Sequence, residues 1–131
     1  MSAALRIVRI HSDSEGHSHF EDIDVGLQSV AYAPPAPAVD VSQPLDASRT
    51  VLCRVPAGWY GDWHPTPRRQ LYFHLSGRLE VHVADGETRH FEAGDIVLVE
   101  DVAGSGHTTR VIGDGPATGA FVHLADEEDA P

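Results

Sequence analysis

The sequence predicts an all-β protein with little helix, built as one closed barrel or sandwich of short strands. Runs of residues alternate between apolar and polar side chains with a period of two, as in strands with one buried face. Short glycine-containing turns separate these runs, and almost no segment shows the 3.6-residue period of a helix. A chain of 131 residues fits one domain around one core, so we expect residues 1–131 to form a single domain.

The first part of the chain, residues 1–48, is predicted to hold one strand and a proline-rich crossing. Residues 5–10, LRIVRI, alternate and indicate a strand with one buried face. The following stretch, residues 11–22, is polar and is interpreted as a loop. Residues 33–44 contain four of the nine prolines, which favours an irregular, extended segment.

Residues 49–124 are predicted to form the barrel itself, and the acidic tail, residues 125–131, is predicted to be flexible. The expected strands cover residues 49–55, 70–75, 78–84, 88–92, 95–99, 107–112 and 118–124. Asp85-Gly86, between two alternating runs, predicts a hairpin with a type I′ turn, in which both central residues need a positive φ.

Composition and charge exclude several classes of function. The formal net charge is −11, and all nine basic residues are arginine. Such an acidic protein repels phosphate backbones and anionic lipids, so neither nucleic acid nor a membrane is an expected partner. The absence of lysine excludes Schiff-base chemistry on a side-chain amine. The sequence shows no signal peptide and no apolar stretch of membrane-spanning length, so we expect a cytoplasmic protein. The single cysteine, Cys53, lies in an apolar run and is interpreted as a small buried hydrophobe rather than a reactive thiol.

The segment of residues 58–77 brings several chemically capable side chains to one face of the predicted sheet. If His64 points into the barrel, the alternation also turns inward Thr66, Gln70, Tyr72 and His74. The opposite face then carries an apolar row, Leu71, Phe73 and Leu75. An exposed row of this kind is unfavourable, so we expect the N-terminal segment or a second subunit of a homodimer to cover it.

A later strand completes the predicted pocket, because the same alternation turns His107 and Thr109 inward. A few convergent polar groups inside an apolar barrel are typical of a small-molecule site. Trp63 lies in the loop that enters this region and either borders the pocket or plugs the end of the barrel. Arg68 either binds a substrate carboxylate or pairs with surface acids such as Glu100 and Asp101.

The spacing of these residues resembles the two sequence motifs of the cupin superfamily. Gly58, His64 and Gly77 match the first motif, G-x5-H-x-H-x3-E-x6-G, while Thr66 and Gln70 replace its second histidine and its glutamate. Gly94, Asp95 and His107 match the second motif, and Glu100 stands where the family usually has proline. The strings SHFED, DWHP, PRRQ and GHTTR are similar to a group of small bacterial cupins that mostly lack an assigned activity. The resemblance implies an RmlC-like jelly-roll barrel, or double-stranded β-helix.

The same resemblance leaves the cofactor open. Metal-binding cupins usually offer three histidines and one glutamate, and the matching positions here hold His64, Gln70 and His107, with His74 as a possible third imidazole. An amide in place of a carboxylate weakens the attraction for a divalent cation. The pocket therefore either holds a transition metal (zinc, iron, nickel or copper) or needs none.

Three functions remain from the sequence. The first is an isomerase, epimerase, lyase or cyclase acting on a small carbonyl-bearing metabolite, with His64 or His107 as the general base and Tyr72 or Gln70 as the donor to the oxyanion. In this hypothesis His74 is a further catalytic candidate, and the expected substrate contacts are Thr66, Gln70, Arg68, Trp63 and Thr109. The second is a metal-dependent, dioxygenase-like enzyme, and the third is a non-catalytic binder or sensor of a small ligand.

The remaining histidines are interpreted as surface residues or left open. His82 and His90 lie on strands whose predicted buried side chains are Leu79, Val81, Val83 and Phe91, so the two histidines are expected to face solvent. His11, His17 and His19 fit a polar loop better than a second metal site. The face to which His123 points is not determined by the sequence.

Overall fold

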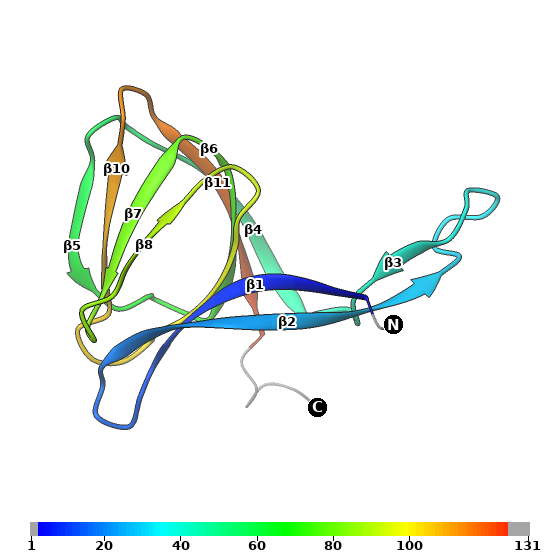
Figure 1. The fold of residues 1–131 in the computed structure, drawn as a ribbon, viewed down its shortest axis with the longest axis horizontal. Coiled ribbons are helices and arrows are strands. Elements are labelled where there is room, and N and C mark those ends of the chain that lie inside the picture. The colour runs from blue at the N-terminus through cyan, green and yellow to red at the C-terminus, as the bar shows by residue number, and fades with distance from the viewer. Residues whose placement is uncertain (1–2, 126–131) are drawn as a thin grey trace.

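The computed structural model describes residues 3–125, and this part of the chain is all β, with eleven strands and no helix (Figure 1). The predicted fold class is therefore confirmed. The strands are β1 (Ala3–Ser12), β2 (Ser18–Val30), β3 (Val39–Val41), β4 (Ala47–Val55), β5 (Tyr60–His64), β6 (Gln70–Ser76), β7 (Arg78–Val83), β8 (Thr88–Phe91), β9 (Ile96–Glu100), β10 (His107–Ile112) and β11 (Ala117–Leu124). No helix in the described range is long and apolar enough to cross a membrane. The predicted flexible tail falls almost entirely on residues 126–131, outside the described range.

The strands form two sheets that face each other. The larger sheet has the order β3-β2-β1-β9-β6-β11-β4, and the smaller has the order β5-β10-β7-β8 (Figure 1). β1 pairs in parallel with β9, whereas the other pairs are antiparallel. Side chains of both sheets meet in one buried cluster, so the core lies between the sheets.

The N-terminal region contains more strand than the sequence predicts. Residues 11–22, interpreted as a loop, instead form the end of β1, a turn and the start of β2, which pair from Ser12 opposite Ser18 onward. The Asp13 carboxylate closes the turn by accepting hydrogen bonds from the backbone N–H groups of Glu15 and His17 (2.9 and 3.0 Å). The short β3 adds to β2 within the proline-rich crossing, and this end of the hairpin extends away from the barrel (Figure 1).

The predicted hairpin at Asp85-Gly86 is present, but its turn type is not the predicted one. Gly86 has a φ of 96°, while no non-glycine residue in the described range has a positive φ, which excludes a type I′ turn. The connection covers residues 84–87, and the Asp85 side chain accepts a hydrogen bond from the Glu87 N–H (2.8 Å). A side-chain acceptor therefore stabilises a longer loop here.

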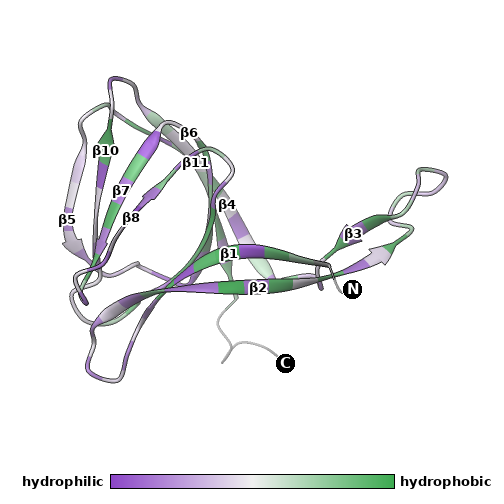
Figure 2. Ribbon diagram, in the orientation of Figure 1, coloured by the Kyte–Doolittle hydropathy of each residue, from purple (hydrophilic) through white to green (hydrophobic). Residues whose placement is uncertain are grey.

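The larger sheet carries apolar side chains on both faces, and the hydropathy colours change in bands along its strand β1 (Figure 2). The inner face looks toward the smaller sheet. On the outer face, the predicted row of β6 begins with Leu71, which is buried against Ile7 and Leu124, and ends with Leu75, which is 57% exposed. Strand β1 therefore supplies part of the expected cover. Coverage of the rest by a second subunit stays a prediction.

Candidate functional site

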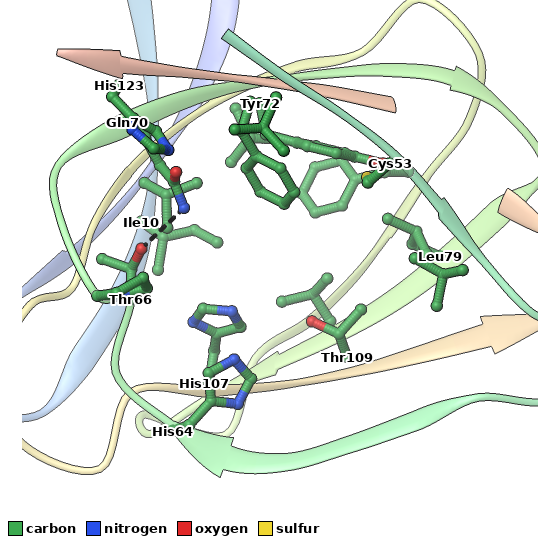
Figure 3. A pocket seen from close by; sticks show the side chains of 18 of the residues that line it. Ile10, Cys53, His64, Thr66, Gln70, Tyr72, Leu79, His107, Thr109 and His123 are labelled. Atoms are coloured by element: carbon green, nitrogen blue, oxygen red, sulfur yellow. Dashed lines mark hydrogen bonds between the residues drawn. The ribbon is translucent and has the colours of Figure 1, made fainter. Parts of the chain in front are cut away.

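A cavity of about 380 Å³ lies between the two sheets (Figure 3). Its polar lining residues are His64, Thr66, Gln70, His107, Thr109 and His123. His123, whose direction the sequence leaves open, thus faces inward on β11. The cavity lies in the size range of ordinary small-molecule sites, about 300–1,000 Å³.

The remaining walls of the cavity are almost entirely apolar. Strand β4 contributes Val51, Cys53 and Val55, and aromatic rings of β6 and β11, Tyr72 and Phe121, pack with centroids 4.9 Å apart. Cys53 is half-buried, and burial raises the pKa of its thiol. A thiol that is harder to ionise fits the interpretation of Cys53 as a small hydrophobe.

Two histidines lie side by side at one end of the cavity, His64 at the end of β5 and His107 at the start of β10 (Figure 3). Their ring centroids are 4.9 Å apart. The close approach depends on Gly106, which has a φ of 74° and runs so near the backbone of His64 that an added Cβ would lie 1.9 Å from the His64 carbonyl oxygen. A residue with a side chain at this position would push the two strands apart.

Each of these imidazoles is held by an oxygen atom on one side. The Nδ1 of His64 donates to the backbone carbonyl of Asp62 (2.6 Å), and the Nδ1 of His107 donates to the Asp101 carboxylate (2.6 Å). Within residues 3–125, neither Nε2 atom has a hydrogen-bond partner among the side chains and backbone groups. Both rings can therefore accept a proton or a ligand hydrogen at Nε2.

Asp101 is the site residue that sequence reasoning missed. It was expected to be a surface acid, yet its exposed fraction is 0%, and its Oδ1 has no hydrogen-bond partner in the described part of the chain. No local pattern marks it, because DVAGSG has the composition of an exposed loop. Its burial follows from the packing of this loop against the backbone of Thr66, whose N–H donates to the Asp101 carbonyl (3.1 Å).

Gln70 and Thr66 form a fixed polar pair beside the histidines. The Gln70 amide donates to Thr66 Oγ1 (3.1 Å), which in turn donates to the backbone carbonyl of Arg68 (2.9 Å). Both side chains are buried, and the figure shows the Gln70 amide next to His123 (Figure 3). The amide group is therefore oriented before any ligand arrives.

The structure corrects the expected placement of His74. Its side chain is buried, as the alternation predicts, but it lies beyond the cavity and does not line it. His74 Nε2 donates to the Gly77 carbonyl (2.7 Å), so its Nδ1 accepts the hydroxyl proton of Tyr72 (2.9 Å). Burial raises the pKa of the Tyr72 phenol well above its usual value. With its proton donated to His74, Tyr72 serves as an apolar wall of the cavity and not as a donor into it.

Two predicted substrate contacts also lie elsewhere. Trp63 is exposed and does not line the cavity, whereas Trp59 does. Arg68 lies in a separate surface hollow with Arg69. Arg69 pairs with Glu100 on the outer face, where Arg9 also donates to Glu100 (2.5 Å). Burial would raise the pKa of Glu100, but the hydrogen bonds from these two arginines outweigh it and hold the pKa below its usual range.

The other histidines lie outside the cavity. His82 and His90 face away from the core and both contact the Glu80 carboxylate, at 3.1 Å each, which lowers the pKa of Glu80. His11, His17 and His19 are on the N-terminal hairpin, and none of them lines the cavity. The sequence does not decide whether His17 and His19 reach the pocket, and the structure places both outside it.

The donor set fits a metal ion poorly. Stable transition-metal sites in proteins use three or four strong ligands. In the range 3–125, no group of three or more histidine, cysteine or acidic side chains is arranged to hold a metal ion. His64 and His107 supply two imidazoles, and Gln70 supplies at most a weak amide oxygen. Two strong ligands fall short of the usual set, so no reaction step is derived through a metal.

Comparisons with known proteins identify the family. A family model described as "Cupin domain" matches residues 51–123, more than half of the chain, while no curated protein matches closely enough to count as a relative. A Cupin 2 conserved barrel domain protein from Salinispora arenicola is 25% identical, with 77% of this chain and 76% of that chain covered and a TM-score of 0.48. The cupin domain of Cnp3 from Schizosaccharomyces pombe is 14% identical, with coverage of 96% and 86% and a TM-score of 0.51. The cavity between the two sheets and the matched region agree: this chain belongs to the cupin domain family.

Proposed function

We propose that this protein binds a small carbonyl-bearing metabolite in the cavity and catalyses proton transfer on it, with His107 as the general base. The observation that carries the proposal is the hydrogen bond between the buried Asp101 carboxylate and His107 Nδ1 (2.6 Å). The fold alone does not support a particular reaction, because one fold hosts many chemistries. The chemistry of this protein therefore depends on the polar end of its cavity.

A buried carboxylate behind an imidazole suits general-base catalysis. It holds the hydrogen on Nδ1, so that the lone pair of Nε2 is directed away from the carboxylate, and it stabilises the imidazolium that forms when Nε2 takes a proton. Within the described range, Asp101 has no arginine partner at hydrogen-bond distance, and its carboxylate bonds to one side chain, that of His107. Its negative charge therefore acts mainly on that ring.

The neighbouring groups supply the other parts of such a reaction. His107 Nε2 takes the proton from the carbon next to the substrate carbonyl, and the electron pair moves onto the carbonyl oxygen to form an enolate. The Gln70 amide donates a hydrogen bond to that oxygen, a role that Tyr72 cannot fill while its hydroxyl donates to His74 Nδ1. His64, 4.9 Å away between ring centroids, takes a proton from water at Nε2 and delivers it to another carbon or to a leaving group, while His107 releases the abstracted proton to water. Isomerisation, epimerisation, cyclisation and elimination all follow this course.

Exchange of α-protons tests the proposal without knowledge of the natural substrate. In D₂O, the protein should accelerate deuteration of 2-tetralone, a small ketone with acidic α-protons, as followed by proton NMR. His107→Ala should reduce the catalysed rate by about 10²-fold or more, because it removes the base. The matched control, His90→Ala, removes an exposed histidine on β8 and should keep the rate.

Each other outcome selects a different function. An unchanged rate in His107→Ala contradicts the assignment of the base. Loss of exchange on chelation, with near-stoichiometric metal in the purified protein, selects the metal-dependent enzyme. Tight binding of 2-tetralone with no accelerated exchange in the wild type selects a non-catalytic binder or sensor.

A further inference from the structure

The cavity combines a large apolar surface with polar groups that are confined to one end. Apolar side chains of β4, β7, β9 and β11 form the walls, including Val51, Val81, Val97 and Phe121. The polar atoms gather around His64, His107 and Gln70 (Figure 3). A ligand that matches this cavity has one oxygenated end and a hydrocarbon body.

No formally charged side chain lines the cavity in the described range. All of its lining residues are apolar or uncharged polar, or are histidines, and the sequence contains no lysine. The Asp101 carboxylate lies behind His107, so a positive charge on that ring is already balanced. A charged ligand group would lose its hydration here without gaining an opposite charge, which is strongly unfavourable.

Most of the side chains at the entrance are apolar as well. The exposed lining residues are Val51, Trp59, His64 and Pro67, on β4, β5 and the segments that flank them. β4 and β5 are the edge strands of the two sheets, so the cavity opens between these edges. Of these four side chains only those of Trp59 and His64 can hydrogen-bond and none is an arginine, so a polyanion or a sugar finds few partners among them.

We propose that the ligand is an uncharged, oxygenated hydrocarbon of one or two rings. Its carbonyl or hydroxyl oxygen lies among His64, His107 and Gln70, and its hydrocarbon body packs against the walls of β4, β7, β9 and β11. The volume of about 380 Å³ equals the space of about a dozen water molecules at roughly 30 Å³ each, which suits one or two rings. The placement of the polar end rests on the proposed function, whereas the preference for an uncharged body rests on the walls alone.

Isothermal titration calorimetry with three probes tests this ligand class on the full chain. The probes are 2-naphthol, its charged analogue 2-naphthoate, and glucose 6-phosphate. We expect 2-naphthol to bind at least about tenfold more tightly than 2-naphthoate, since the carboxylate loses hydration without a counter-charge. Glucose 6-phosphate should not bind. Equal or tighter binding of 2-naphthoate, binding of glucose 6-phosphate, or no binding of 2-naphthol overturns the proposal.

Adjacent residues of β4 provide a matched pair of variants. Val51 lines the cavity, and Leu52 lies on the opposite face with an exposed fraction of 78%. Val51→Arg should improve binding of 2-naphthoate relative to 2-naphthol by about tenfold, because it places a cation in the wall. Leu52→Arg should leave the ratio unchanged. If both variants shift the ratio equally, the probes bind outside the cavity and the proposal fails. If Val51→Arg does not fold, the relative affinities of the wild-type protein for the three probes still test the proposed ligand class.

These results separate the ligand class from the reaction. Selective binding of 2-naphthol together with an unchanged exchange rate in His107→Ala keeps the ligand class and rejects the proposed base. Preferred binding of 2-naphthoate together with a normal loss of exchange in His107→Ala keeps the base and rejects the ligand class.

Discussion

The inner and outer faces of the seven-stranded sheet are both apolar. The polar groups beside the two faces differ in whether they are paired with one another. On the outer face, charged side chains pair with one another, as Glu100 does with Arg9 and Arg69. Across the cavity from the inner face, His64 and His107 of the smaller sheet are each held at Nδ1, and within the described range Nε2 has no partner. Charged side chains that already form ion pairs do not need a ligand as a partner, whereas oriented and unpaired nitrogen atoms are available to bind one.

The comparison shows that apolar alternation does not by itself mark a functional face. Strand β4 places Val51 inside and Leu52 outside, with similar chemistry on both sides. The two faces differ in what lies opposite. The smaller sheet encloses the inner face and leaves a cavity, while the outer face packs Leu71 among side chains of the same sheet. Function therefore depends on enclosure combined with unpaired polar atoms.

The largest expected effect comes from neutralising Asp101, the buried carboxylate that bonds to His107. Asp101→Asn keeps the size of the side chain, but the amide can donate to His107 Nδ1 and so favour the tautomer with hydrogen on Nε2, which cannot act as a base. We expect the rate of 2-tetralone exchange at saturating substrate to fall by about 10²–10⁴-fold, with little change in KM.

The matched control is the preceding residue. Glu100→Gln alters the outer ion pairs and should cost at most about 1 kcal/mol of stability, with the exchange rate unchanged. A normal rate in Asp101→Asn would show that the carboxylate is only structural. A loss of rate in both variants would show that the two faces are not independent.

The parts of this site that the sequence predicts are those governed by alternation. Once His64 is assigned to the inside, the period of two places Thr66, Gln70 and Tyr72 correctly in the cavity wall. The same rule turns His74 inward but cannot give its depth along the barrel, where its imidazole contacts Gly77 instead of a ligand. The direction of a side chain follows from local strand geometry, whereas its depth along the barrel depends on the whole fold.

The parts that the sequence does not predict depend on long-range contacts. Strand β5 has the aromatic composition of a loop plug, and it becomes a strand because β10 pairs with it. β2 begins within a polar string and is specified by its pairing with β1. Asp101 is buried because its loop packs against Thr66, about 35 residues earlier in the chain. None of these contacts leaves a periodic pattern in its own segment.

A smaller effect is expected from separating the two inner histidines. Gly106→Ala would place a Cβ 1.9 Å from the His64 carbonyl oxygen, so the backbone of β5 or β10 must move. We expect a loss in the free energy of unfolding of more than about 2 kcal/mol, measured by urea denaturation, and slower 2-tetralone exchange.

Gly58→Ala is the control for backbone conformation. Gly58 has a φ of 76°, close to the 74° of Gly106, but a Cβ there would meet no atom within 4 Å. It should cost only the strain of the left-handed conformation, about 1–2 kcal/mol, and spare the exchange rate. Equal losses in both variants would mean that the close approach at Gly106 is not important.

The smallest expected effect concerns the contact that ties the larger sheet to the smaller one and so helps to enclose the inner face. His19 of β2 donates from Nε2 to Asp13 (2.7 Å) and from Nδ1 to Asp85 in the β7–β8 turn (2.9 Å), with the His11 ring 5.8 Å away. Hydrogen bonds to both carboxylates raise the pKa of His19, and the His19 hydrogen bond lowers the pKa of Asp13 to about 2.

The sign of the pH dependence follows from these shifts. The contribution of His19 is present below its ordinary pKa of about 6.5 and is lost as the pH rises through the raised value, while that of Asp13 is lost only as the pH falls toward about 2. His19→Gln should therefore lower Tm more at about pH 5.5 than at about pH 8.5, by a few degrees at most, because the groups are solvent-accessible. His17→Gln, in the same hairpin, should show a smaller difference between the two pH values, since its contact with Glu15 is longer (3.7 Å) and more exposed. An equal Tm loss at both pH values in His19→Gln would show that the ring joins the sheets by packing and not by charge.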